Sequence, residues 1–592
     1  MIKRILNPNQ ILSLLFYTTV FLFFATIYKY HLYFKEQQQL FLLTAEYFVN
    51  TVKVPGGFLN YIGEFLTQFY YWPIAGAVII TFLIFIMQSA TTKILNKIKK
   101  NPNLFPLSFL PAMFYGVLLC NDFYYLAGLV GFCISLWISV LYYNLNNRTI
   151  RFVFGIILIP MLSYLIGGAY LLFVVLISIF ETIQIIKNGS KKINLLIIII
   201  YLLIAVVFPL LLRQYFTITI LQAFLTGAYY KLEVVLPFSL VLLVLSYPSL
   251  MLIYRYVTIQ STEKRKGLLI FSIQSVIIYT IGGIILFKSS FWGASNFVAY
   301  DNFARKGEWS EIIEMAKKEN PQDQLSLVYL NLALSKTGQL GNQLFQFRQT
   351  GTNGLVLNDN NNNYEPFLVG NELYYHLGLV NVAQYFAFEG METTPDHKKN
   401  VRCIKRLAET NLINSQYNVA LKYLKLLDNT LFYSNWAKEK MLYLKNENKI
   451  NKDPEYGLMR NLKPRSQYFF TYDQVDVILR ICMKDNPKNI RAFEYLMTYY
   501  LLNKDLKSFK SYYSLGKEAL TSNVPKSFQE AVIYIISHQV DQLNSSTIPG
   551  FVTADVVNRL NQYANIFTSY PNPKDLLEKN FKDTFWFYFQ YR

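Results

Sequence analysis

The sequence predicts an all-α fold in which a polytopic bundle of about nine transmembrane helices precedes a soluble helical domain. Long apolar runs fill residues 1–288, whereas residues 289–592 have the composition of a soluble protein. Positive charge recurs in every second gap between the apolar runs. In the second half, apolar residues recur at helical spacing. We therefore expect a transmembrane domain over residues 1–288 and a second domain over residues 289–592.

Each predicted span has nearly the length that is needed to cross about 30 Å of hydrocarbon. The spans are residues 11–29, 73–90, 104–120, 126–144, 152–166, 169–186, 193–212, 235–256 and 268–288. Gly167 and Gly168 form the whole turn between the fifth and sixth spans. This part of the bundle is therefore predicted to consist of helical hairpins.

Lysine and arginine concentrate in alternate gaps between the spans, and this pattern predicts the orientation. The basic gaps are residues 3–4, 93–100, 148–151, 187–192 and 264–266. Since basic loops face the cytoplasm, the N-terminus is predicted to be cytoplasmic and the second domain extracytoplasmic. The richness in Ile, Asn, Lys and Tyr is typical of AT-rich bacterial genomes, so we expect a bacterial inner membrane and a periplasmic domain. Much of the net charge of +19 lies in these loops, so no nucleic-acid partner is predicted.

Two outer loops are predicted to have structure of their own. Residues 30–72 are aromatic throughout and are apolar at helical spacing on both sides of Pro55, Gly56 and Gly57. This pattern predicts two amphipathic helices that lie on the membrane surface. Residues 213–234 form a shorter version of the same pattern.

The second domain begins with a predicted pair of helices that are separated at Asn320 and Pro321. Similar units follow it along the chain. A small residue on one helix, such as Ala333, packs against aromatic residues on the next, which resembles tetratricopeptide repeats in degenerate form. We therefore expect a TPR-like α-solenoid, with residues 351–366 as a polar loop within it.

Carboxylates are rare in the first half and supply its candidate functional residues. They are Glu36, Glu46, Glu64, Asp122, Glu181, Glu233 and Glu263. Glu36, Asp122 and Arg213 fall together at the outer mouth of the predicted bundle, where an unpaired ionisable group is costly and suggests function. Each has a structural alternative: Glu36 begins a solvated helix, Asp122 caps the fourth span, and Arg213 is a snorkelling anchor.

Other polar residues favour structural interpretations. Glu46, Glu64 and Glu233 are expected on the wet faces of surface helices, and His31 is expected to cap the first span rather than to join a site. Cys403 and Cys482 are expected to be buried free thiols, although a disulfide between them is the alternative. The chain contains no signature of nucleotide, redox or zinc chemistry, and its cofactor is unknown, with a divalent cation as the candidate.

The order of elements resembles the C-type glycosyltransferase superfamily: a first span, a long outer loop with an acidic residue and two surface helices, further spans, and a soluble outer domain. This resemblance implies transfer of a sugar or glycan from a polyprenyl phosphate carrier to an acceptor. By position, Glu36 matches the loop carboxylate that acts as base or metal ligand, Asp122 a second acid, and Arg213 the residue that holds the lipid phosphate.

The segments EQQQLF, WSEII, LNLALSKTGQLG and RLAETNLI also resemble a family of uncharacterised bacterial membrane proteins with a TPR-like outer tail. That resemblance implies no activity. The sequence thus leaves a second hypothesis open, in which the chain is a non-enzymatic scaffold. Its spans then contact membrane lipids, and its tail recruits envelope proteins.

Overall fold

A computed structural model shows an all-helical chain, and no β-strand occurs in the part of the chain that it describes. The described residues are 7–122, 124–188, 191–216, 218–225, 237–257, 264–292, 297–357, 364–516, 524–539 and 548–592. The chain forms two compact units. Unit 1 contains Met1–Ala294 together with Thr394–Val401 and Asn429–Ser434, and unit 2 contains the remaining residues.

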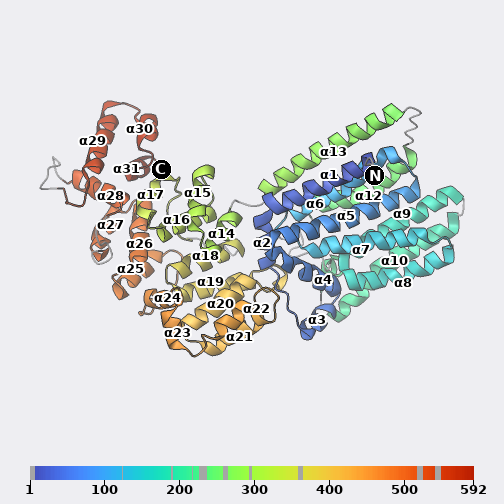
Figure 1. Cartoon of the computed structure of the whole chain (residues 1–592), viewed down its shortest axis with the longest axis horizontal. Coiled ribbons are helices and arrows are strands. Elements are labelled where there is room, and N and C mark those ends of the chain that lie inside the picture. The colour runs from blue at the N-terminus through green and yellow to red at the C-terminus, as the bar shows by residue number, and fades with distance from the viewer. Residues whose placement is uncertain are drawn as a thin grey trace, which may run out of the picture. The chain divides into compact units, whose positions relative to one another are not determined.

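Unit 1 is built from long apolar helices that lie side by side (Figure 1). Its elements are α1 (Pro8–Leu22), η1 (Phe23–Ile27), α2 (Lys29–Gln37), α3 (Ala45–Val52), α4 (Gly57–Thr67), η2 (Gln68–Tyr71), α5 (Pro73–Ile98), η3 (Pro102–Phe109), α6 (Leu110–Leu119), α7 (Leu126–Asn144), α8 (Arg148–Ile166), η4 (Gly167–Ala169), α9 (Tyr170–Asn188), α10 (Lys191–Phe216), α11 (Ile220–Leu225), α12 (Phe238–Tyr256) and α13 (Lys264–Trp292).

Eight segments of the described chain are long and apolar enough to cross a membrane, which supports membrane association. One of them, Arg148–Ile186, contains both the fifth and the sixth predicted spans. Within it, Gly167 adopts a φ of 54° and a ψ of −144° and ends α8, so that α8 and α9 are separate helices that pack on each other. The nine predicted spans thus correspond to eight apolar segments.

The predicted outer loop contains the two expected helices, α3 and α4, on either side of Gly56, which has a φ of 74°. In contrast to a helix that only lies on a surface, α4 packs closely against α7. A Cβ atom on Gly63 would lie 2.7 Å from the Cα atom of Ala127, and Leu59 is fully buried. The absence of a side chain at Gly63 therefore allows the two helices to approach.

Except for η6, the helices in the rest of the chain belong wholly or mostly to unit 2. They are α14 (Phe297–Lys306), α15 (Trp309–Glu319), α16 (Gln324–Lys336), α17 (Leu340–Gln343), η5 (Leu344–Gln346), α18 (Tyr364–His376), α19 (Val380–Glu392), η6 (Pro395–His397, which lies in the part of the chain assigned to unit 1), α20 (Val401–Ile413), α21 (Tyr417–Asp428), α22 (Ser434–Met441), α23 (Glu447–Lys452), α24 (Tyr456–Leu462), α25 (Val475–Asp485), α26 (Ile490–Leu502), α27 (Leu506–Tyr512), η7 (Tyr513–Gly516), α28 (Lys526–Ser537), α29 (Ala554–Ser569), α30 (Lys574–Phe581) and α31 (Phe585–Tyr591).

The helices of unit 2 pack as neighbours along the chain, such as α15 with α16 and α18 with α19. Asn320 ends α15 in a left-handed conformation with a φ of 49°, at the break that the sequence predicts. Ala333 is fully buried on α16, while its packing in a TPR-like repeat stays a prediction. The predicted polar loop is shorter than expected because Tyr364 already begins α18, while residues 358–363 lie outside the described residues.

Unit 2 also contains a buried charge network that the sequence analysis missed. The Arg402 guanidinium lies 2.5 Å from a carboxylate oxygen of Asp301, and that of Arg406 lies 2.9 Å from Glu372. Burial alone would raise the pKa of Glu372, but Arg406, a hydrogen bond with His376, and Arg402 together hold it well below its usual range. The network joins α14, α18 and α20, and it satisfies charges that would be costly if left unpaired.

Candidate functional site

The candidate site lies at the end of α2, where five consecutive polar residues, Lys35 to Gln39, are all buried. Glu36 is 2% exposed and Gln38 is fully buried. α2 follows the first apolar helix almost without interruption, because only the turn at Tyr28 separates it from η1. The chain therefore carries charged groups directly from a membrane helix into a packed interior, where each of them needs a partner.

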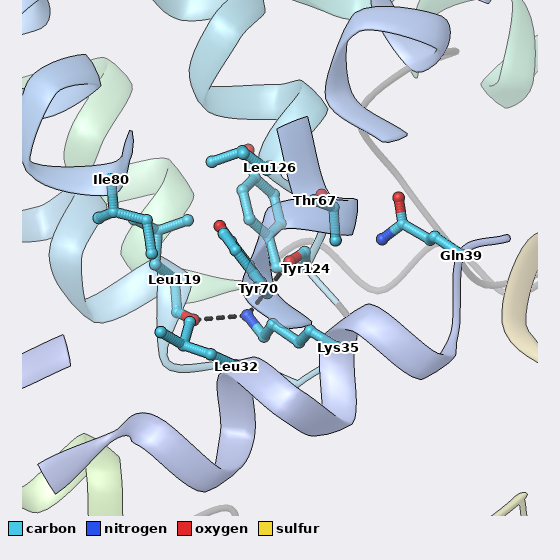
Figure 2. Close-up of a pocket in the computed structure, with 9 residues that line it drawn as sticks. All are labelled: Leu32, Lys35, Gln39, Thr67, Tyr70, Ile80, Leu119, Tyr124 and Leu126. Atoms are coloured by element: carbon cyan, nitrogen blue, oxygen red, sulfur yellow. Dashed lines mark hydrogen bonds between the residues drawn. The ribbon is translucent and has the colours of Figure 1, made fainter. Parts of the chain in front are cut away.

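Lys35 obtains its partners from the backbone (Figure 2). Its ammonium group donates hydrogen bonds to the carbonyl oxygens of Leu119, at 2.6 Å, and Tyr124, at 3.3 Å. Beside it, Thr67 and Tyr70 line a cavity of about 10 Å³, which has room for one water molecule. Burial lowers the pKa of Lys35 to about 8, although the charge of Asp122 opposes this shift.

Asp122 forms a second part of the cluster together with Tyr28, which directly precedes α2, and His31 on α2. The Tyr28 hydroxyl donates a hydrogen bond of 3.0 Å to Asp122, and Nδ1 of His31 lies 2.8 Å from the same carboxylate oxygen. The rings of Tyr28 and His31 stack with their centroids 4.2 Å apart. The alternative that Asp122 caps the fourth span is wrong, because α7, which is that span, begins after Tyr125 without a side-chain cap. The interpretation of His31 as a cap of the first span is also wrong, because His31 lies within α2 and pairs with Asp122.

Glu36 forms the third part of the cluster, and the alternative that it begins a solvated helix is wrong. It lies at the end of α2, and its carboxylate accepts a hydrogen bond from the Gln37 amide. The Tyr433 hydroxyl lies 2.9 Å and 2.8 Å from the two carboxylate oxygens of Glu36 and accepts a hydrogen bond from Gln37. The pocket that Glu36 lines with Tyr433 and Phe432 is also about 10 Å³ in volume.

Tyr433 belongs to one of two short segments from the second predicted domain that are part of unit 1, Thr394–Val401 and Asn429–Ser434. The Leu40 amide donates to the carbonyl oxygen of Lys399, and the Leu43 amide donates to that of Asn429. These two segments therefore close the end of α2 by backbone pairing.

Side-chain contacts add to this pairing. Phe432 stacks on Tyr71 with ring centroids 4.8 Å apart. Glu64 accepts hydrogen bonds from both Lys398 and Tyr47. Glu64 is 2% exposed, so its predicted place on a wet helix face is wrong, because the sequence did not reveal the partner that pairs with it.

The remaining sequence-predicted residues lie outside this cluster. Nε of Arg213 donates a hydrogen bond of 2.8 Å to the Ile218 carbonyl oxygen, and no described contact joins this exposed arginine to Glu36 or Asp122. Glu46 is exposed, as predicted, whereas Glu233 lies outside the described residues. The expectation that Cys403 and Cys482 are buried free thiols is confirmed.

The donor set does not fit a divalent cation at Asp122. Asp122 already accepts from Tyr28 and pairs with His31, and within the described ranges no group of three or more His, Cys, Asp or Glu side chains is arranged to hold a metal ion. Elsewhere in unit 1, Glu181 forms a buried ion pair of 2.9 Å with Arg151. That pair accounts for a carboxylate within an apolar segment without any catalytic role.

The apolar helices and the charged cluster at their end define an all-helical protein with several helices that are long and apolar enough to cross a membrane. The chain belongs to a family of unknown function, DUF6057, which it matches over residues 4–592. No curated protein and no solved structure matches the chain.

Proposed function

We propose that the chain is a membrane-anchored binding protein of the bacterial inner membrane, whose TPR-like tail faces the periplasm and recruits an envelope protein. The observation that carries this proposal is an aromatic patch on unit 2, formed by Tyr385, Phe388 and Phe469. Their exposed fractions are 41%, 47% and 93%. Exposed aromatic side chains are enriched at protein interfaces, because their burial releases much water-exposed apolar area.

Two of the three members of the aromatic patch lie on the same helix. Tyr385 and Phe388 are three residues apart on α19 and therefore share a helix face. The ring of Tyr385 is 6.4 Å from that of Phe470, which directly follows Phe469 in the chain. Exposed aromatic side chains that share one helix face are typical of an interaction site.

The closed state of the cluster in unit 1 also favours a binding role. An enzyme of the predicted kind requires Glu36, Asp122 and Arg213 to face one substrate-sized cavity. Among the described residues, two cavities at the end of α2 each have room for about one water molecule, and neither is lined by Asp122 or Arg213. The buried charges are instead satisfied by neighbouring groups of the chain.

Site-specific photocrosslinking of the full-length chain in native membranes tests this proposal. A photoreactive phenylalanine analogue at position 388 or 469 is expected to give one adduct of the same mass. The matched control is position 570, where Tyr570 is 55% exposed on a different part of unit 2. Equal adducts at all three positions, or none at 388 and 469, would refute the aromatic patch as the binding surface.

The buried ionisable residues favour a second candidate, the C-type glycosyltransferase. In this reaction, the acceptor hydroxyl oxygen bonds to the anomeric carbon and its proton passes to Glu36. The bond from the anomeric carbon to the phosphate oxygen breaks, and the phosphate keeps the electron pair. Asp122, the second acid, holds the ring of His31 on α2, and Arg213 holds the lipid phosphate with guanidinium nitrogens that have no described partner. Tyr433 must first leave Glu36.

Transfer from a polyprenyl-phosphate sugar by the reconstituted chain tests this candidate. Glu36→Gln is expected to abolish transfer, whereas Glu46→Gln, which changes an exposed carboxylate on α3, is expected to leave it intact. Equal transfer by both variants would remove Glu36 from the role of base. A folded wild-type chain that transfers no sugar would leave the binding role as the better account.

A further inference from the structure

A cationic groove in unit 2 lies away from the aromatic patch and has no role in the proposed function. It is about 700 Å³ in volume and lies between the chain around η5 and the helices α30 and α31. Four cationic side chains and one carboxylate line it. They are Arg348, Lys574, Lys582, Arg592 and Glu578. The volume is within the range of small-molecule binding sites.

The positive charge of this groove is largely uncompensated. Within the described ranges, Arg348, Lys574 and Lys582 form no ion pair, and Arg592 reaches Glu578 only at 3.8 Å. Arg348 donates instead to the neutral side chain of Gln322, at 3.0 Å. A concave surface lined by unpaired charges of one sign concentrates ligands of the opposite sign. The groove is therefore suited to an anion.

The remaining lining residues indicate what the anion is attached to. The rings of Phe345 and Phe587 are 3% and 1% exposed and form an aromatic floor, on which the partly exposed Tyr591 packs with its ring centroid 5.2 Å from that of Phe587. Polar neutral side chains, including those of Gln346 and Thr350, are exposed around this floor. Such groups hydrogen-bond to hydroxyls, and the partly exposed ring of Tyr591 can pack on a sugar ring.

A lipid surface fits the groove less well. Membrane-surface binding requires protruding apolar side chains beside the basic ones, but the phenylalanine rings of this groove are buried. We propose that the cationic groove binds an acidic oligosaccharide, whose acidic groups pair with Arg348, Lys574 and Lys582 and whose sugar rings lie over Tyr591. This inference does not depend on the protein partner of the aromatic patch.

Direct binding to the purified full-length chain in detergent tests the proposal. The probes are a heparin-derived hexasaccharide, the neutral sugar maltohexaose and the peptide hexaglutamate. The acidic sugar is expected to bind at least about tenfold more tightly than either of the others, and its affinity is expected to fall as salt is added. Equal binding of hexaglutamate would overturn the sugar assignment, and equal binding of maltohexaose would overturn the role of charge.

Matched variants locate the site. The double variant Lys574→Glu with Lys582→Glu is expected to weaken binding of the acidic sugar about tenfold or more. The control is Lys579→Glu. Lys579 is an exposed lysine of α30 that does not line the groove, so this change is expected to leave the affinity within about twofold of wild type. Because all these side chains are exposed, circular dichroism is expected to be unchanged. An equal loss with Lys579→Glu, or no loss with the double variant, would place binding elsewhere.

Discussion

Removal of one hydroxyl group, in Tyr433→Phe, tests whether residues 429–434 close the end of α2. The Tyr433 hydroxyl lies within 2.9 Å of both oxygens of the buried Glu36 carboxylate. A hydrogen bond to a charged group contributes roughly 1.5–3 kcal/mol, because its loss leaves a desolvated charge with one donor fewer. A loss of about 2 kcal/mol raises the equilibrium constant for local opening about thirtyfold.

Hydrogen exchange measured by mass spectrometry reports this opening directly. The Leu43 amide, which donates to the Asn429 carbonyl oxygen at 2.7 Å, is expected to exchange about thirtyfold faster in Tyr433→Phe than in wild type. The matched control is Tyr417→Phe, which removes a tyrosine hydroxyl from an exposed carboxylate, that of Glu447. Exchange around Leu43 is expected to be unchanged in that control. Equal protection of Leu43 in wild type and Tyr433→Phe would refute the closing role of Tyr433.

Three further predictions concern stability, each measured by thermal or chemical unfolding of the purified chain. Gly63→Ala should lower the free energy of unfolding by about 1–3 kcal/mol, because the new methyl group pushes α4 away from α7. The control Gly283→Ala should leave it unchanged, because no atom lies within 4 Å of the new methyl group. Equal effects of the two changes would refute the close approach of α4 and α7. Burial lowers the pKa of Lys35 from 10.5 to about 8, so the unfolded chain binds more protons than the folded chain between pH 8 and 10.5. The free energy of unfolding of wild type should therefore rise by about 3 kcal/mol relative to that of Lys35→Met as pH rises through this window. A pH-independent difference would contradict it. Burial raises the pKa of Glu530 from 4.5 to about 7. The free energy of unfolding of wild type should therefore fall by about 3 kcal/mol relative to that of Glu530→Gln as pH rises from 4.5 to above 7, and a pH-independent difference would contradict this.

The helical architecture was predictable because its signals are local. Apolar runs of sufficient length, the glycine pair at Gly167 and the Asn320–Pro321 break each specify structure within a few residues of chain. The exception was α4, whose burial against α7 depends on the fit between Gly63 and Ala127. No periodicity within α4 itself reveals that contact.

The partners of the candidate site were not predictable in the same way. Glu36 was recognised as unusual, but Tyr433, which holds it, lies 397 positions later in the chain. Lys35 was missed because a lysine beside a glutamate is typical of a solvated helix, and only its two backbone acceptors reveal its burial. The polar run from Lys35 to Gln39 was the one available signal, since five consecutive polar residues directly after a membrane helix need partners.

An electron cryomicroscopy map of the full-length chain in lipid nanodiscs tests most directly whether the end of α2 is a closed structural junction or a reaction site. We predict that the Glu36 carboxylate remains bonded to Tyr433 and that the space beside Lys35 holds no more than about one water molecule. Extended lipid density that runs between membrane helices to Glu36, with Tyr433 displaced, would contradict the binding role and support glycosyl transfer instead.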